Sequence, residues 1–66
     1  MVLILMNTGE YVFVEDAFRV NRTDTQIICL DREDRIVTQF DLGAISMYTA
    51  NAEIIRTVIR EIAGND

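Results

Sequence analysis

The sequence has no histidine, lysine, tryptophan or proline, and only one cysteine among its 66 residues. Without histidine there is no imidazole base and no common ligand for a transition metal. Without lysine there is no amine for a Schiff base and no lysine for a phosphate-binding loop. Cys29 alone can form neither an intramolecular disulfide nor a structural zinc site. We therefore expect a protein that is not an enzyme and that uses no metal or cofactor.

Long hydrophobic runs are also missing. The longest, residues 1–6, is far shorter than the roughly 20 residues of a membrane helix. No basic segment precedes it, as one would in a secretory signal peptide. A single unpaired cysteine suits a reducing compartment. The expected location is therefore the cytoplasm.

Basic residues are scarce. Six arginines face eleven carboxylates, which gives a net charge of −5. Direct nucleic-acid binding needs a basic patch that displaces counterions from phosphates, and anionic membranes also attract basic segments. We expect neither nucleic acid nor membrane as a direct partner.

The residues that are present predict an α+β fold in a single domain, residues 1–66. Short apolar or alternating stretches separated by turn formers are typical of strands, and the turns at 7–9 and 32–34 predict two hairpins. We predict an antiparallel meander of four to five strands, followed by one C-terminal amphipathic helix. The candidate strands are 2–6, 11–14, 17–20, 26–31, 35–40 and 45–49, and the helix is 52–63. Residues 17–20 either continue the preceding strand after a bulge or form a short strand of their own.

The helix carries the clearest periodic pattern in the chain. Its apolar residues fall within an arc of about 140° at 100° per residue. Asn51 is a good N-cap and Gly64 is placed to end the helix. The apolar residues of this stripe are Ile54, Ile55, Val58, Ile59 and Ile62.

The predicted sheet has more apolar surface than this helix can cover. A helix is about 10 Å wide and strands lie about 4.8 Å apart, so one helix covers about two strands on one face. We expect a second copy of the chain to cover the rest, with the helix packed on its own sheet or exchanged between copies. A larger partner is the alternative. The residues assigned to the core or the oligomer interface are Leu3, Leu5, Val12, Val14, Ile28, Leu30, Ile55 and Ile59.

Two groups of charged residues are candidate contact sites. Arg56 and Arg60, four apart on the helix, form a candidate anion site that Arg19 and Arg22 could complete, although a solvated pair is the simpler interpretation. A candidate acidic surface for a partner protein comprises Asp31, Glu33, Asp34 and Asp41. A solvated hairpin tip is the simpler interpretation there.

Three functional hypotheses follow. The first is a homo-oligomeric interaction module that binds and modulates, or inhibits, another protein. The second is a binder of a small anionic metabolite or nucleotide at the subunit interface. The third is an acidic mimic of nucleic acid that occupies the groove of a basic enzyme.

Overall fold

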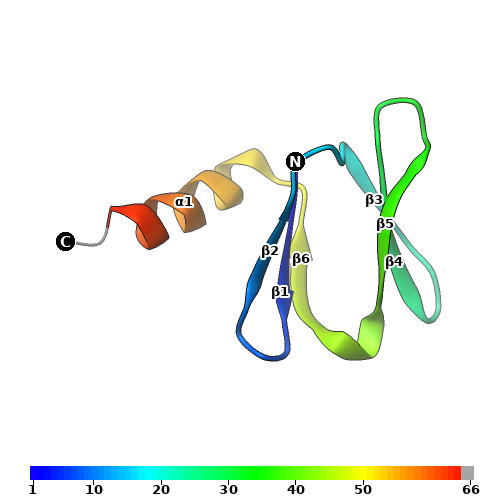
Figure 1. Cartoon of the computed structure of the whole chain (residues 1–66), viewed down its shortest axis with the longest axis horizontal. Helices are drawn as coiled ribbons and strands as arrows, with labels where there is room; N and C mark the ends of the chain where they lie inside the picture. The colour runs from blue at the N-terminus through cyan, green and yellow to red at the C-terminus, as the bar shows by residue number, and fades with distance from the viewer. Residues whose placement is uncertain (65–66) are drawn as a thin grey trace.

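The computed structural model describes residues 1–64 and shows an α+β fold with one C-terminal helix (Figure 1). All strand pairs are antiparallel. The elements are β1 (Val2–Met6), β2 (Tyr11–Val14), β3 (Arg19–Arg22), β4 (Gln26–Leu30), β5 (Ile36–Asp41), the 3₁₀-helix η1 (Leu42–Ala44), β6 (Ile45–Thr49) and α1 (Ala52–Ala63).

The strands form two three-stranded sheets, with the orders β2-β1-β6 and β3-β4-β5. The prediction of one sheet of four to five strands is therefore wrong. Both β1 and β4 are apolar on their two faces, and two facing sheets bury one face of each strand. In a single sheet with one covering helix, much of that surface would stay exposed.

The chain passes between the sheets at residues 15–18, which the sequence placed partly in a strand. Ala17 is buried there, and its N–H donates to the Val14 carbonyl at 3.3 Å. The following Phe18 N–H reaches the Leu30 carbonyl at 2.6 Å. Strand β3 consequently begins at Arg19 as a separate strand, two residues later than predicted.

Both predicted hairpins are confirmed. In the first, β1 pairs with β2 so that Val2 faces Val14, and Gly9 takes a positive φ of 90° in the turn. In the second, β4 ends at Leu30, because the backbone of Asp31 already closes the turn, and β5 extends to Asp41.

Strand β5 departs from strict alternation near its start. Thr38 pairs with Cys29, whereas Ile36 pairs with Leu30, so the register shifts by one residue at Val37. The sequence placed Ile36 on the same face as Thr38. The bulge instead moves Ile36 to the outside, where 62 % of its surface is exposed.

The core lies between the two sheets. It consists of inward-facing residues of β1 and β4 together with Val14 and Ala17. The partly buried residues that pack around it are Met6, Val12, Val20, Phe40, Leu42, Ile45 and Tyr48. Because β1 and β4 are the central strands, every other strand is paired to one of them. The four central-strand residues of the core are Val2, Ile4, Ile27 and Cys29.

Replacing Ile27 with alanine should destabilise the protein by about 2–5 kcal/mol, because the side chain is fully buried and its removal leaves a cavity. The matched control is Ile36→Ala in the adjacent strand, which should change the free energy of unfolding by no more than about 0.5 kcal/mol. Urea unfolding at one fixed protein concentration measures both. Equal losses in the free energy of unfolding for the two variants would show that the core does not lie where β4 packs.

Candidate functional site

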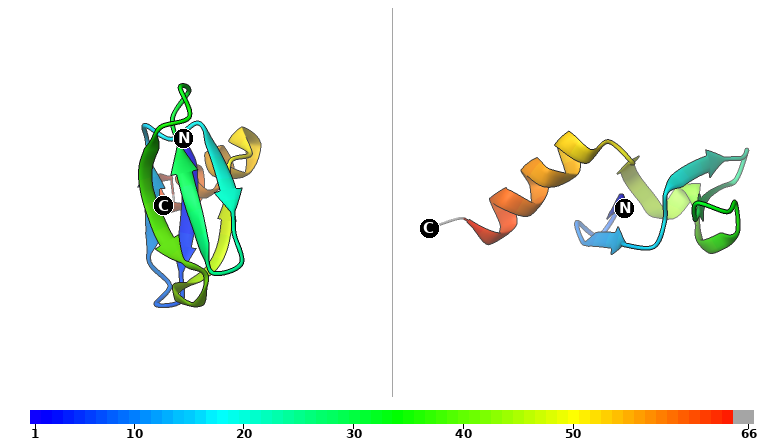
Figure 2. Two further views of the ribbon diagram at one scale, coloured as in Figure 1. Left: turned by 90° about the vertical axis from the view of Figure 1, so that its right-hand side faces the viewer. Right: turned by 90° about the horizontal axis from the view of Figure 1, so that it is seen from above.

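Helix α1 extends away from the two sheets instead of lying flat on one of them (Figures 1 and 2). It projects on the side of the β2-β1-β6 sheet that faces away from the other sheet. The radius of gyration is 12.0 Å, against about 10.8 Å for a compact chain of this length. The surface area of 4615 Å² likewise exceeds the roughly 4,300 Å² of a compact monomer of this mass.

The helix is well specified by its own sequence. As predicted, Asn51 caps it: the Oδ1 atom accepts from the backbone N–H of Glu53 at 2.9 Å and of Ile54 at 3.2 Å. Gly64 ends it with an N–H that donates to the Arg60 carbonyl at 2.7 Å. Only Ile55 is buried among the residues of this helix. The other apolar residues of the stripe remain wholly or partly exposed.

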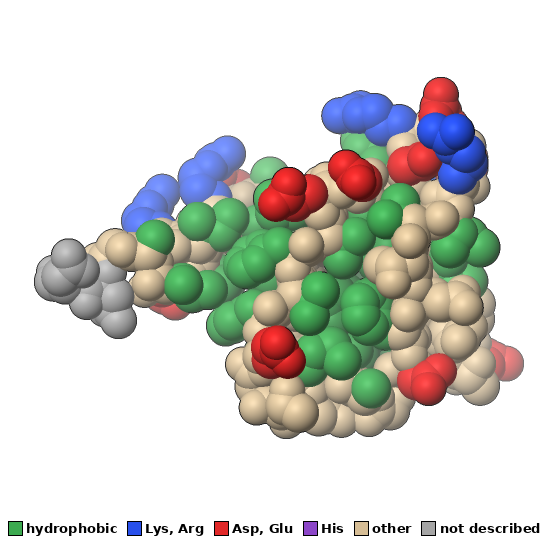
Figure 3. Space-filling view, in the orientation of Figure 1, with side chains coloured by type: hydrophobic (Ala, Val, Ile, Leu, Met, Phe, Trp, Pro, Cys, Tyr) green, Lys and Arg blue, Asp and Glu red, His purple; other side chains and the backbone are tan. Residues whose placement is uncertain are grey.

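Helix α1 and the outer face of the first sheet, β2-β1-β6, meet at an angle. We call the apolar surface on the two sides of this angle the apolar notch. Leu5, Tyr11 and Phe13 lie on that outer face, because Leu5 pairs with Tyr11 and both alternate with core residues. Figure 3 shows hydrophobic side chains along the lower side of α1 that continue onto this sheet. The helix contributes Ile54, Val58 and Ile62, which fall within about 80° of its circumference.

The other side of α1 borders a cleft of about 410 Å³, which we call the helix cleft. Arg56 and Ile59 line it from the helix, together with the buried Ile55. Phe18 lines it from the segment between the sheets and Arg32 from the β4–β5 loop. Met1, Ala50 and Ala52 complete the lining.

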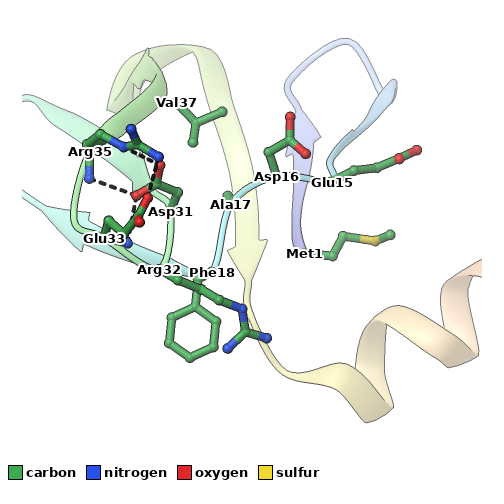
Figure 4. Close-up of a pocket in the computed structure, with 10 residues that line it drawn as sticks. All are labelled: Met1, Glu15, Asp16, Ala17, Phe18, Asp31, Arg32, Glu33, Arg35 and Val37. Carbon is green, nitrogen blue, oxygen red and sulfur yellow. Dashed lines mark hydrogen bonds and ion pairs between the residues drawn. The ribbon is translucent and has the colours of Figure 1, made fainter.

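Arg32 lies over the ring of Phe18, with its Cζ atom 4.4 Å from the ring centroid. Such stacking is a cation–π contact, which orients the guanidinium without using its N–H groups. Figure 4 shows Arg32 and Phe18 turned away from the neighbouring loop acids. The sequence alone places Arg32 only in a charged turn, because nothing near it in sequence reveals the contact with Phe18.

The loop between β4 and β5 is organised by Asp31. Its Oδ1 atom accepts from the backbone N–H groups of Glu33 at 2.8 Å and Arg35 at 2.9 Å, and Oδ2 accepts from Arg35 Nε at 3.0 Å (Figure 4). The backbone N–H of Arg35, followed by that of Glu33 and by the Arg35 side chain, lowers the pKa of Asp31 although partial desolvation opposes this. Asp34 adopts a positive φ of 63° in the same turn.

A larger cleft of about 740 Å³ adjoins this loop and shares Met1, Phe18 and Arg32 with the helix cleft. Three of its charged lining residues pair with one another, because Arg35 binds both Asp31 and Glu33. The remaining lining residues are Glu15, Asp16, Ala17 and Val37.

The four arginines predicted as an anion site do not converge. Arg19 pairs with Asp34 through Nη2 at 2.6 Å. Arg22 lines a separate cleft with Leu42 and residues 45–48. Arg56 pairs with Glu53 and lines the helix cleft, whereas Arg60 lies one turn further along α1. The structure instead brings Arg56 and Arg32 to one cleft.

The four predicted surface acids are also divided. Asp31, Glu33 and Asp34 share the β4–β5 loop, where Arg35 and Arg19 pair with them. Asp41 lies at the far end of β5, where Gln26 Nε2 donates to it at 3.4 Å.

The residues assigned to the core or interface fall into distinct places. Val14 belongs to the core between the sheets and Val12 packs against it. Leu3, Leu30 and Ile55 are buried, Leu5 and Ile28 are half-buried, and Ile59 is exposed.

No helix within residues 1–64 is long and apolar enough to cross a membrane. In the same residues no three acidic or cysteine side chains come together as a metal site would require. Comparison with protein-family models, curated proteins and solved structures finds no match to the chain.

Replacing Asp31 with alanine should lower the melting temperature at pH 7 and should lower it less at acid pH. Folding lowers the pKa of Asp31, so the ionised carboxylate stabilises the folded protein at pH values above about 4, the pKa of Asp31 in the unfolded chain. This stabilisation is lost as the pH falls through the lower pKa of Asp31 in the folded protein. Asp31→Asn keeps an acceptor for the two backbone N–H groups, so it should lower the melting temperature less than Asp31→Ala.

Thermal unfolding from pH 7 to pH 3 measures these differences. Glu10→Gln is the control, since the Glu10 side chain forms no hydrogen bond within residues 1–64. A gap between wild type and Asp31→Ala that stays constant across this range would contradict the assigned role.

Proposed function

We propose that this protein is a small, non-enzymatic interaction module that forms a homodimer and in that form binds and modulates another protein. The apolar notch carries the proposal. It exposes large aliphatic side chains on a helix that buries only Ile55 against its own chain. A helix of 12 residues is marginal without packing, so this surface favours a partner.

The helix of a second copy matches the notch in length. The helix is about 18 Å long and a five-residue strand about 17 Å, so a helix matches the sheet face beside it. Each chain offers both a protruding apolar helix and an open apolar sheet face. A two-fold axis can therefore place the helix of each copy in the notch of the other, which makes the two contacts equivalent.

A small interface needs only a modest share of the surface of this chain. Small specific interfaces bury about 1,200 Å² in total, or about 600 Å² per chain. That is about 13 % of the 4615 Å² that this chain exposes. None of the six notch residues, Leu5, Tyr11, Phe13, Ile54, Val58 and Ile62, is charged. The dimer therefore buries no ion at its centre.

A protein with a basic surface is the partner that the charge favours. Each chain carries −5, and complementary charge accelerates encounter between proteins. The nucleic-acid mimic is the weaker alternative, because arginines pair with three acids of the β4–β5 loop instead of leaving a continuous negative row. A reducing compartment such as the cytoplasm suits the buried, unpaired Cys29, whose pKa burial raises.

Replacing Ile62 with aspartate should convert the dimer to a monomer without unfolding it. The side chain is 55 % exposed in the single chain, so the substitution costs little there, whereas it places a charge inside the dimer. Tyr11→Asp should act in the same way from the sheet half of the notch. Size exclusion with light scattering at about 100 µM, where a complex of micromolar Kd is nearly fully formed, gives the mass.

Thr57→Asp is the matched control, because it adds the same charge to an exposed position about 140° from Ile62 on the helix. It should remain dimeric, and circular dichroism should show the same fold for all variants. A wild-type mass near 7.6 kDa at this concentration would overturn the proposed dimer. Dimers of unchanged stability for both Ile62→Asp and Tyr11→Asp would show that copies associate elsewhere.

A further inference from the structure

The helix cleft combines apolar walls with two guanidinium groups and holds no acidic residue among those described as lining it. Its volume of about 410 Å³ falls within the range of small-molecule sites. We propose that this cleft binds a small aromatic carboxylate carrying a single negative charge. Arg32 and Arg56 bind the carboxylate, and the apolar walls hold the ring.

Arg32 is not paired with the acids that flank it in sequence. Asp31 and Glu33 flank it in sequence, but both bind Arg35. Within residues 1–64, Arg32 forms no ion pair of its own. Phe18 covers one face of its guanidinium, so the N–H groups at the edge remain available. A planar carboxylate accepts two parallel hydrogen bonds from such an edge.

Arg56 supplies the second positive charge from the helix. Its partner Glu53 is mostly exposed, and exposed ion pairs contribute little, so the guanidinium can turn to a ligand. The residues that line the helix cleft, counted with Glu53, carry one net positive charge, and Glu15 and Asp16 line the adjoining larger cleft instead. The chain as a whole is negative. Both facts favour a monoanion over a doubly charged phosphate.

Apolar side chains of the cleft surround the ring of the ligand. The Phe18 side chain is 49 % exposed and Ile59 is 41 % exposed, and both line the cleft. A flat ring placed between them covers apolar surface that the chain leaves open. Such a ligand joins α1 to the segment between the sheets and to the β4–β5 loop. It uses the Ile59 side of the helix, so it does not occupy the apolar notch and does not rest on the dimer.

Titration with naphthoate, followed by the amide shifts of isotopically labelled protein, tests the site. We expect saturable shifts at Phe18, Arg32 and residues 50–56. Naphthamide, which has the ring without the charge, should bind about tenfold more weakly, and so should acetate, which has the charge without the ring. Measuring the dimer and the Ile62→Asp variant side by side separates the cleft from the dimer, since binding should persist in both.

Arg32→Gln and Arg56→Gln should each weaken naphthoate binding about tenfold through loss of a charged donor. Arg60→Gln is the matched control on the same helix and should bind as wild type does, because Arg60 does not line the cleft. Equal binding of naphthoate by all three variants, or equal binding of naphthoate and naphthamide, would overturn the proposal. Tighter binding of a tripeptide ending in phenylalanine would assign the cleft to peptide chain ends and would also overturn it.

Discussion

The packing of β1 against β4 is the contact on which the rest of this structure depends. Val2 and Ile4 from one strand meet Ile27 and Cys29 from the other, and all four are fully buried. Each strand is the centre of its own sheet, so the remaining strands are held by hydrogen bonds to one of the two. A chain of 66 residues buries only about 60 % of its unfolded surface, and this chain has no disulfide to help. The apolar contact between the sheets therefore has to supply most of its stability.

The outer face of β1 links this core to the helix. Leu3 alternates with Val2 and Ile4 and is fully buried, although it points away from the second sheet. The helix begins on that side, and Ile55 is its one buried residue. Contact at the start of α1, with free length beyond it, leaves the apolar notch on one side and the helix cleft on the other. One short helix thereby defines both candidate surfaces.

Four ion pairs within residues 1–64 satisfy part of the charge locally. Arg35 and Arg19 pair with the acids of the β4–β5 loop, and Arg56 pairs with Glu53 within the helix. As ion pairs these surface contacts add little to stability, and Asp31 stabilises the fold mainly by accepting from two backbone N–H groups. The main effect of the ion pairs is to determine which charges remain for a ligand or a partner. Arg32 stands apart because its contact is with the Phe18 ring instead of a carboxylate.

The sequence by itself determined the local features. The two hairpins, the faces of β1 and β2, the Asn51 cap and the end of the helix at Gly64 all follow from residues close together in the chain. These are short-range effects of alternation, turn formers and capping, which a sequence displays directly.

Only the tertiary structure decided the division into two sheets, the bulge at Val37, the contact of Arg32 with Phe18 and the placing of Arg32 and Arg56 at one cleft. Alternation shows that a strand has two apolar faces, but it does not show what covers each face. That choice depends on contacts between residues far apart in the chain. The amphipathic helix illustrates both parts: its stripe was evident from the sequence, whereas the exposure of most of that stripe follows from where α1 leaves the first sheet.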